Sequence, residues 1–456
     1  LSPAAQTRML AQFSVSEGFD KVTDNAINLM PYKLAHSIWM NQAHLAVKNS
    51  PEKGTRAGEN PAIRNLFYRL CCILKLPIFP LFIFDGNKRP QTKRGITVKT
   101  TKRHWLTLPF QKFIEAFGFS HYTAPGEAEA ELAQLNQKGE IDAIISEDSD
   151  CLAYGACCVI RMNNVRDDGG QIRIFDTKSI QAAPDVSLDR SGLFLMAILC
   201  GGDYHKGLQG CEWKTACEIS RTPLANSLFT TAEHLPSKES LSAFLSDWRK
   251  SFRTLLEQDP DNELTHTYPA LARNVTSKFP PVDIVLLYGQ PVTSWSTGCS
   301  PPDKSEWYLH QPCLSEIEVL CKKYFSWGSS GEFPSRTKKT LWPGVAIRYL
   351  LSHVNVRKYI ADTPQNSCSI GYLHIPYIFQ ARLGPGLAST LPDVAGFTIQ
   401  TFSRNFIIES IAKLDDEIKS LIMDSIPSSG EKISFWIPES ILLAASPGLV
   451  KKFKGK

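Results

Sequence analysis

Apolar residues recur along the chain with two periods, which together predict helices and short buried strands. Residues 60–76 carry apolar side chains at helical spacing. Residues 81–84 and 141–145 are short apolar runs, typical of strands buried on both faces of a parallel sheet. Further helices are predicted over 105–117, 307–325 and 220–262, and the last has an apolar stripe of Leu241, Phe244, Leu245, Trp248, Phe252 and Leu255.

Acidic residues follow the ends of these apolar runs. Asp85 follows the first run, and Asp203 follows another apolar run, 193–199, which we count with the strand ends. Two further clusters are present. The first lies at the start of a predicted helix after the Pro125-Gly126 turn and consists of Glu127, Glu129 and Glu131. The second follows the run 141–145 and consists of Glu147, Asp148 and Asp150. Ligands bind at the carboxyl edge of open parallel sheets. Either cluster alone fits a solvated surface equally well, but several acidic ends together favour a divalent-metal site with Mg²⁺ or Mn²⁺.

A basic stretch without acidic residues follows Asp85-Gly86. It consists of Lys88, Arg89, Lys93, Arg94, Lys99, Lys102 and Arg103. Beside an acidic cluster, we expect such a strip to hold a phosphate backbone, although composition alone fits a solvated loop as well. The aromatic residues Trp105 and Phe110 come next, and we expect them to anchor the following helix in the core rather than to stack on bases.

Composition sets the outer bounds. The chain of 456 residues has 43% hydrophobic and 21% charged residues and a formal charge of +5. These values describe an ordinary globular protein with two or three domains, so a nucleic-acid partner must be argued from local patches. The sequence contains no run of eighteen or more apolar residues, so we expect no transmembrane helix. The twelve cysteines form no zinc pattern, and Cys71, Cys72, Cys158 and Cys200 are predicted to be buried free thiols of a reducing compartment.

The motifs in order resemble one known family. FDG at 84–86, APGEAEAE at 124–131, SEDSD at 146–150 and GGDY at 201–204 are similar to the XPG/flap endonuclease family of structure-selective DNA nucleases. The resemblance runs from the start of the chain to about Trp295, and the arch and tail are most like the fungal GEN-type Holliday-junction resolvase branch. It implies an α/β, PIN-like 5′-nuclease fold with a central, mostly parallel sheet flanked by helices. It also implies a helix–two-turn–helix subdomain and a small C-terminal β-rich, chromodomain-like module.

The resemblance also implies boundaries and roles. The N-terminal nuclease region with its basic arch would cover 1–104, the internal region 105–200, the helical subdomain 201–327 and the C-terminal module 340–456. Two metal ions would be held by Asp85, Glu127, Glu129, Asp148, Asp150 and Asp203, with Lys93 on the scissile phosphate. Glu131 and Glu147 would be neighbours of these ligands. Gly207, Gly210 and Lys214 would form the DNA-binding turn that holds K⁺ in the family.

Three departures from the family pattern stand out. The chain begins with Leu1, and the short glycine-containing segment that opens similar proteins is absent, which suggests a fragment or an imperfect gene model. Ala35 occupies a position where the family has a ligand aspartate, and the neighbouring His36 is a poor substitute for a hard oxygen donor. Glu212 replaces a turn glycine, and its carboxylate would repel DNA phosphate and weaken K⁺ binding.

Three functions therefore remain open. The first is metal-dependent cleavage of 5′ flaps or Holliday junctions during DNA repair and recombination in the nucleus, with a homodimer on four-way junctions left open. The second is a junction-binding pseudonuclease, suggested by Ala35. The third is a PIN-like ribonuclease. In the C-terminal module, 328–339 is the best boundary, and a helix at 342–351, strands at 372–379 and 396–402 and a closing strand and helix are expected, with a DNA-contacting or structural role favoured.

Overall fold

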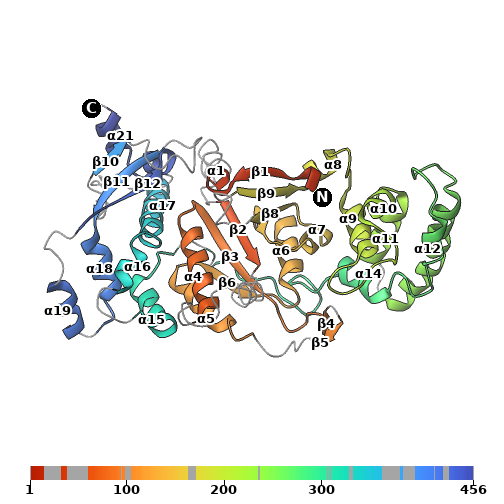
Figure 1. Ribbon diagram of the computed structural model, residues 1–456, viewed down its shortest axis with the longest axis horizontal. Helices are drawn as coiled ribbons and strands as arrows, with labels where there is room; N and C mark the ends of the chain where they lie inside the picture. The colour runs from red at the N-terminus through yellow and green to blue at the C-terminus, as the bar shows by residue number, and fades with distance from the viewer. Residues whose placement is uncertain are drawn as a thin grey trace.

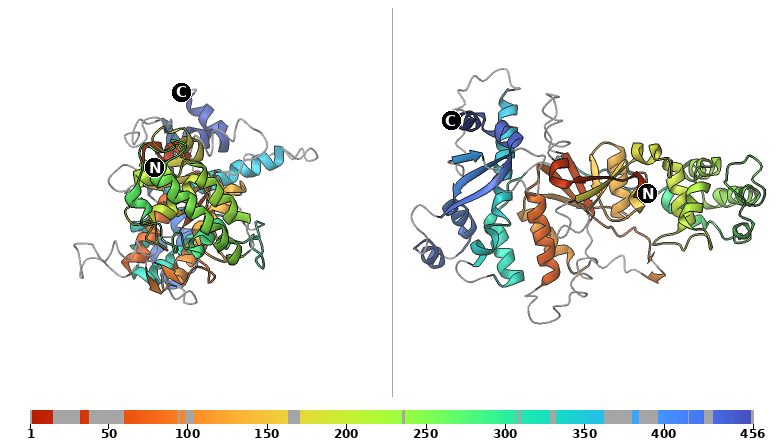
Figure 2. Two further views of the ribbon diagram at one scale, coloured as in Figure 1. Left: turned by 90° about the vertical axis from the view of Figure 1, so that its right-hand side faces the viewer. Right: turned by 45° about the horizontal axis from the view of Figure 1, so that its top comes forward.

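The chain folds around a seven-stranded sheet between two smaller parts. The computed structural model describes residues 2–14, 32–37, 60–93, 95–97, 104–162, 171–234, 237–305, 307, 310–327, 332–361, 380–383, 396–414, 416–424 and 431–454. Figure 1 shows a row of three parts, with the sheet in the middle, a helical part on the right and the C-terminal part on the left. The second view in Figure 2 keeps the same order.

The large sheet has the strand order β1-β9-β8-β7-β2-β3-β6. Its strands are β1 (Gln6–Met9), β2 (Tyr32–Ser37), β3 (Ile78–Phe84), β6 (Ser120–Thr123), β7 (Ala143–Ile145), β8 (Cys158–Met162) and β9 (Gln171–Asp176). Pairing is parallel from β6 through β8, whereas β9 is antiparallel to both β8 and β1. The expectation of a central, mostly parallel sheet is therefore confirmed.

Strand β3 is buried along its whole length because both faces of the sheet are covered. Ile78, Phe82 and Phe84 belong to one hydrophobic core, and Phe79, Leu81 and Ile83 belong to the other. This alternation is the two-residue period of a strand. The first core contains α4 (Pro61–Leu74) and α5 (Thr107–Ala116), and the second contains α6 (Ala128–Gln137) and α7 (Asp150–Ala153).

The helical part follows β9. Its elements are α8 (Thr177–Ala182), α9 (Arg190–Cys200), α10 (Trp213–Ile219), α11 (Pro223–His234), α12 (Lys238–Gln258), α13 (Pro269–Ala272) and α14 (Val282–Gly289). The apolar stripe predicted on 220–262 lies on α12, where Leu241, Leu245 and Trp248 are buried. Two short strands, β4 (Thr92–Lys93) and β5 (Ile96–Thr97), form a hairpin that ends the described part of the basic stretch. The short segments η1 (Ser2–Ala4) and α1 (Leu10–Phe13) flank β1.

The C-terminal part pairs β10 (Gln380–Leu383), β11 (Gly396–Phe402) and β12 (Lys432–Pro438) in an antiparallel sheet. Its helices are α15 (Leu314–Phe325), α16 (Glu332–Thr337), α17 (Trp342–Ala361), α18 (Ser403–Ile411), α19 (Asp416–Asp424), α20 (Glu439–Ala445) and α21 (Pro447–Lys454). The strand expected at 396–402 is β11. The strand expected at 372–379 lies outside the described residues.

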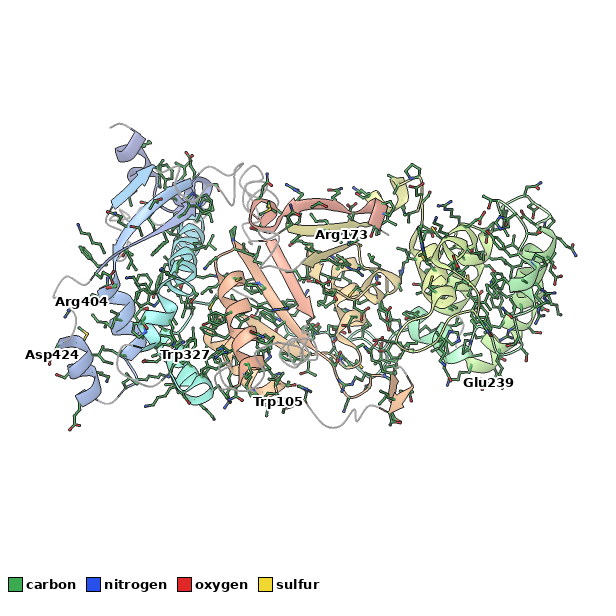
Figure 3. All side chains as sticks on the ribbon, viewed as in Figure 1. Trp105, Arg173, Glu239, Trp327, Arg404 and Asp424 are labelled. Carbon is green, nitrogen blue, oxygen red and sulfur yellow. The ribbon has the colours of Figure 1, made fainter. Side chains whose placement is uncertain are left out.

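Trp327 joins this part to helix α4, which covers the large sheet. Its ring contacts Phe67 of α4, with 5.8 Å between the ring centroids. The labelled Trp327 in Figure 3 lies between the C-terminal helices and the sheet part. One hydrophobic core therefore runs from the sheet across 328–339, the expected boundary, into the C-terminal helices.

Several sequence expectations are wrong. Residues 193–199 form part of helix α9, not a strand, and the helix expected from 307 begins at Leu314. Trp105 is 53% exposed and does not anchor α5, whereas Phe110 is buried as expected. Cys72 and Cys200 are exposed, although all the described cysteines are free. None of the helices in the described ranges is long and apolar enough to cross a membrane.

Candidate acidic centre and DNA-binding turn

Asp85 lies directly after β3, and its carboxylate is fixed by its neighbours. Oδ1 accepts a hydrogen bond from the backbone N–H of Ala128 at 3.0 Å, and Oδ2 pairs with Arg89 at 3.3 Å. The next residue, Gly86, donates its N–H to the carbonyl of Gly126 at 2.7 Å. These contacts join the end of β3 to the turn that precedes α6.

The first turn of α6 carries three glutamates, as predicted. Glu127 is the N-cap of α6, and Glu129 in its first turn lies close enough to Asp85 for the two carboxylates to interact electrostatically. Glu131 is fully buried and is satisfied by the protein, because it accepts hydrogen bonds from the Tyr122 hydroxyl and the Ser294 N–H, both at 2.8 Å. An acidic first turn suits the positive end of the helix dipole.

The second acidic cluster follows β7. The Asp148 N–H donates to Ser146 Oγ at 3.0 Å, and Asp148 Oδ1 accepts from the Asp150 N–H at 2.9 Å. These bonds form a tight turn that starts α7 at Asp150. Glu147 lines the cavity beside this turn.

Lys93 of β4 lies among the carboxylates. Its Nζ is 2.9 Å from Asp203 Oδ2 and 3.6 Å from Glu127 Oε1. Burial alone lowers the pKa of Lys93, but Glu127 and Asp203 outweigh burial and raise that pKa above its ordinary value. The ammonium is therefore charged and partly offsets the acidic cluster.

Three of the carboxylates have disturbed pKa values because they are partly or fully buried close to one another. Burial raises the pKa of Glu127, and burial with Asp85 and Glu127 raises that of Glu129 well above its ordinary value. Burial and Asp148 raise the pKa of Asp150 to about 7. Clustered carboxylates with raised pKa values mark functional sites more often than structural ones.

A cavity of about 530 Å³ opens beside these groups. Four of the predicted ligands line one wall of it, namely Glu129, Asp148, Asp150 and Asp203. Arg161, Phe175 and Met196 contribute to the remaining lining. The cavity thus offers both carboxylate oxygens and apolar surface to a ligand.

The structure brings the six predicted ligands into one electrostatic cluster but does not converge them on one point. Within the ranges that the structure describes, no three His, Cys, Asp or Glu side chains are arranged to hold a metal ion. The reason is visible in the contacts: Lys93, Arg89 and tyrosine hydroxyls take the carboxylate oxygens instead.

Ala35 lies deeper in the sheet than the carboxylates. The register pairs it with Leu81 of β3 and with Ile144 of β7, four positions before Asp85 and Asp148. At about 3.3 Å per residue, position 35 is roughly 13 Å from that edge. Residues 38–59, which follow β2 in the chain, lie outside the described residues.

Tyrosines are the residues that sequence reasoning missed. Tyr154 and Tyr204 donate to Glu127, and Tyr288 donates to Asp150 at 3.1 Å. Tyr204 is adjacent to Asp203 in the GGDY motif and Tyr154 follows the SEDSD motif, so both could have been suspected. Tyr288 is 138 positions from its partner, and no local signal reveals it.

The glycine-rich turn connects α9 to α10. Gly201, Gly207 and Gly210 all have positive φ, at 74°, 77° and 84°. A Cβ at position 207 would stand 2.4 Å from the carbonyl oxygen of Leu199, so this close approach requires glycine. Glu212 caps α10 without a side-chain hydrogen bond, and Glu212 and Lys214 are exposed.

Only part of the basic stretch can be placed. Lys88 donates to the Cys299 sulfur at 3.2 Å, Arg89 pairs with Asp85 and Lys93 joins the acidic cluster. The remaining predicted DNA-binding side chains lie outside the described residues, namely Arg94, Lys99, Lys102 and Arg103.

The sequence matches two family domains. The XPG N-terminal domain covers residues 32–106, and the XPG I-region covers residues 118–203. Flap endonuclease GEN of Drosophila melanogaster is 30% identical over 175 residues, 31% of this chain and 24% of the relative. Flap endonuclease GEN homolog 1 of Homo sapiens is 28% identical over 186 residues, 37% of this chain and 20% of the relative. The chain thus spans about a quarter of these relatives or less.

Solved structures agree on the fold. The Holliday junction-resolving enzyme GEN1, in complex with product DNA and Mg²⁺, has a TM-score of 0.69 at 23% identity, covering 99% of this chain and 96% of the other. The catalytic core of Rad2 in complex with DNA substrate has a TM-score of 0.51 at 21% identity, covering 75% and 97%.

The mixed sheet and the helices around it give the chain the same α/β fold as these nuclease structures. In sequence the chain is similar to the XPG/flap endonuclease family over residues 32–106 and 118–203, and the relatives that it matches include flap endonucleases of the GEN type.

Proposed function

We propose that this chain is a divalent-metal-dependent endonuclease that cuts branched DNA, namely 5′ flaps and Holliday junctions. The observation that carries the proposal is the gathering of six carboxylates, two of them paired with Lys93, beside a cavity at the carboxyl edge of the sheet. A metal-dependent DNA hydrolase needs carboxylates to hold its cations and a positive group to meet the negative phosphodiester.

The donor set fits a hard divalent cation. Asp85, Glu127, Glu129, Asp148, Asp150 and Asp203 offer only oxygen atoms, which Mg²⁺ and Mn²⁺ prefer. The raised pKa values of Glu127, Glu129 and Asp150 reflect a site that lacks enough positive charge, which a cation would supply. When bound, a pair of such ions lowers the pKa of water and stabilises charge on a leaving oxygen.

The residues of the chain do the positioning. Lys93 holds a positive charge at the edge of the cluster, where the scissile phosphate would replace a carboxylate as its partner. Lys88, Arg89, Arg94, Lys99, Lys102 and Arg103 form the strip that would neutralise the strand being cut. The Asp85–Arg89 pair keeps the start of this strip next to the acidic centre.

The turn between α9 and α10 is proposed as the duplex clamp. The positive φ values of Gly207 and Gly210 let the backbone approach a phosphate, and Lys214 lies at the start of the next helix. A K⁺ ion held by carbonyl groups there would have Glu212 as a close negative neighbour. We therefore propose weaker K⁺ dependence than a glycine at position 212 would give.

We propose the wider organisation as follows. Residues 1–104 and 105–200 form the nuclease core, 201–327 the duplex-binding helical part, and 340–456 a chromodomain-like module with a structural or DNA-contacting role. The substrate implies action in the nucleus during DNA repair and recombination. Paired cuts in a four-way junction require two copies of the chain on one junction.

The test is cleavage of end-labelled 5′-flap and four-way-junction DNA with Mg²⁺ or with EDTA. We expect metal-dependent nicks near the branch, and their loss in an Asp148→Ala, Asp150→Ala double variant. Equivalent RNA substrates run in parallel, because preferential RNA cleavage would favour a PIN-like ribonuclease. Absence of branch-selective binding would overturn the proposal.

A second function is favoured by one observation, the alanine at position 35. A junction-binding pseudonuclease would bind branched DNA with high selectivity and leave it intact. The register places position 35 four residues before Asp85 and Asp148, so Ala35→Asp alone should neither restore cleavage nor change binding. Cleavage by the unaltered chain would exclude the pseudonuclease.

A further inference from the structure

Three tyrosines surround the acidic centre and donate to its carboxylates. The Tyr154 hydroxyl donates to Glu127 Oε2 at 3.3 Å, and the Tyr204 hydroxyl donates to Oε1 of the same carboxylate. The Tyr288 hydroxyl donates to Asp150 Oδ2 at 3.1 Å. Tyr154 and Tyr288 also pack against each other, with 5.2 Å between ring centroids.

These three tyrosines lie on helices or next to helices, not on the strands of the large sheet. Tyr154 follows α7, Tyr204 lies in the turn after α9, and Tyr288 belongs to α14. Tyr154 and Tyr288 are almost completely buried, at 2% and 3% exposure. A tyrosine hydroxyl is both donor and acceptor, and a carboxylate only accepts, so each of the three hydroxyls donates to its carboxylate.

A fixed donor has a defined effect on a buried carboxylate. It favours the ionised form, which is the form that binds a cation, and it selects one orientation of the carboxyl plane. One oxygen of Asp150 is held by Tyr288. The other, Oδ1, faces position 202 in the turn that carries Asp203, where a Cβ would stand 3.8 Å away. A carboxylate has about four lone-pair sites, so a hydroxyl and a cation can share it.

We propose that Tyr154, Tyr204 and Tyr288 are positioning residues that orient Glu127 and Asp150 for divalent-cation binding. The proposal rests on the proposed function, because it assumes that these carboxylates are metal ligands. Tyr288 adds a connection that the other two lack. Its helix, α14, packs on α9, α11 and α12, so the docking of the helical part sets the position of the Asp150 carboxylate.

The close packing of α14 supports this connection. A Cβ at Gly289, the residue after Tyr288, would stand 2.8 Å from the Cβ of Ala232 on α11. The helix therefore has little room to shift against α11. Because α9 leads directly into the two-turn element, the proposed duplex clamp and the acidic centre share one rigid set of helices.

The experiment measures Mn²⁺ binding by electron paramagnetic resonance in the full chain. Tyr288→Phe removes one hydroxyl and keeps the ring packing. We expect its dissociation constant for Mn²⁺ to rise about tenfold, the size of effect typical for residues that support a metal ligand. The Tyr154→Phe, Tyr204→Phe double variant removes both donors to Glu127 and should weaken Mn²⁺ binding further.

Tyr268→Phe is the matched control. The Tyr268 hydroxyl donates to Glu218 Oε2 at 2.6 Å, a tyrosine–glutamate bond in the helical part away from the acidic cluster. It should cost similar stability and leave Mn²⁺ affinity unchanged. Thermal melting of both variants separates loss of folding from loss of binding.

The outcomes are distinct. Wild-type Mn²⁺ affinity in Tyr288→Phe, with binding still abolished by the Asp148→Ala, Asp150→Ala double variant, overturns the positioning role and leaves the nuclease proposal intact. Absence of Mn²⁺ binding to the unaltered chain overturns both. Weakened binding in Tyr268→Phe to the same extent as in Tyr288→Phe also contradicts the proposal, because it shows a general loss of structure. In the cleavage assay, Tyr288→Phe should raise the Mg²⁺ concentration that is needed for the half-maximal rate if Tyr288 has a positioning role.

Discussion

Gly86 offers a direct test of how the acidic centre is assembled. It follows Asp85 and lies against the turn that precedes α6, and a Cβ at this position would stand 1.9 Å from the Ala124 carbonyl oxygen and 2.3 Å from that of Pro125. An ordinary carbon–oxygen contact needs about 3.3 Å. In Gly86→Ala the two segments must therefore separate by about 1.4 Å.

That separation acts on the catalytic geometry. It moves Asp85 away from Glu127 and Glu129 and breaks the bonds that join the two segments, including the Gly86 N–H to Gly126 carbonyl bond at 2.7 Å. A misplacement of about 1 Å costs about 100-fold in rate. We expect Gly86→Ala to cut flap cleavage about 100-fold and to cost about 1–3 kcal/mol of stability through overpacking.

Cleavage of end-labelled flap DNA and thermal melting measure these two effects. Gly139→Ala is the control, because Gly139 has a φ of 69° but no atom lies within 4 Å of a Cβ built there. Its left-handed backbone costs about 1–2 kcal/mol for alanine, so its stability loss is comparable while the centre stays intact. A cleavage rate for Gly86→Ala equal to that of Gly139→Ala would refute the assembly proposed for Asp85 and α6.

Three other predictions follow from contacts in the site. Lys93→Met should lower the cleavage rate about 100- to 1000-fold at saturating Mg²⁺, because a preorganised charge on the phosphate is lost, and unchanged cleavage would contradict that role. Burial and Asp148 raise the folded-state pKa of Asp150 to about 7 from an unfolded value near 4. The stability that this group contributes is therefore complete below about pH 4 and is lost as the pH rises through about 7. Melting temperatures of the metal-free protein should fall over that pH range, and Mg²⁺ should restore them. Asp150→Asn should flatten this dependence of the melting temperature on pH. Gly207→Ala should weaken binding to branched DNA at least tenfold in a gel-shift assay while Mn²⁺ affinity is kept, since the added Cβ would meet the Leu199 carbonyl at 2.4 Å.

The sequence predicts the strand ends of the site well because their signals are local. The run at 81–84 ends in Asp85, and the structure has β3 end at Phe84. The run at 193–199 misleads because a short apolar segment suits a buried helix as well as a strand. A helix signal was present: Asp189 caps α9 by accepting from the Gly192 N–H at 2.8 Å. A capping residue before an apolar run should have outweighed the run itself.

The remaining errors arise from contacts that no local pattern reports. Trp105 is exposed because α5 begins at Thr107, and Leu106 and Phe110 supply its buried face. Tyr288 reaches Asp150 only because α14 packs back on α9. The contacts of Lys93 Nζ with Glu127 and Asp203 cannot be seen in a sequence, since they depend on where the chain returns in space.

The acidic centre also depends on residues that carry no chemistry. Repelling carboxylates hold their places only if the strands beneath them cannot move, and β3 is fixed by separate cores on its two faces. One of these cores reaches into the C-terminal part: Phe113 of α5 stacks on Phe325 at 5.6 Å, and a Cβ at Gly344 of α17 would stand 2.9 Å from Leu74 of α4. Helices α15 and α17 therefore cover α4 and α5. These two helices in turn cover β3, and Asp85 follows directly after β3. The C-terminal part contributes to the site through this packing even where it offers no ligand to metal or DNA.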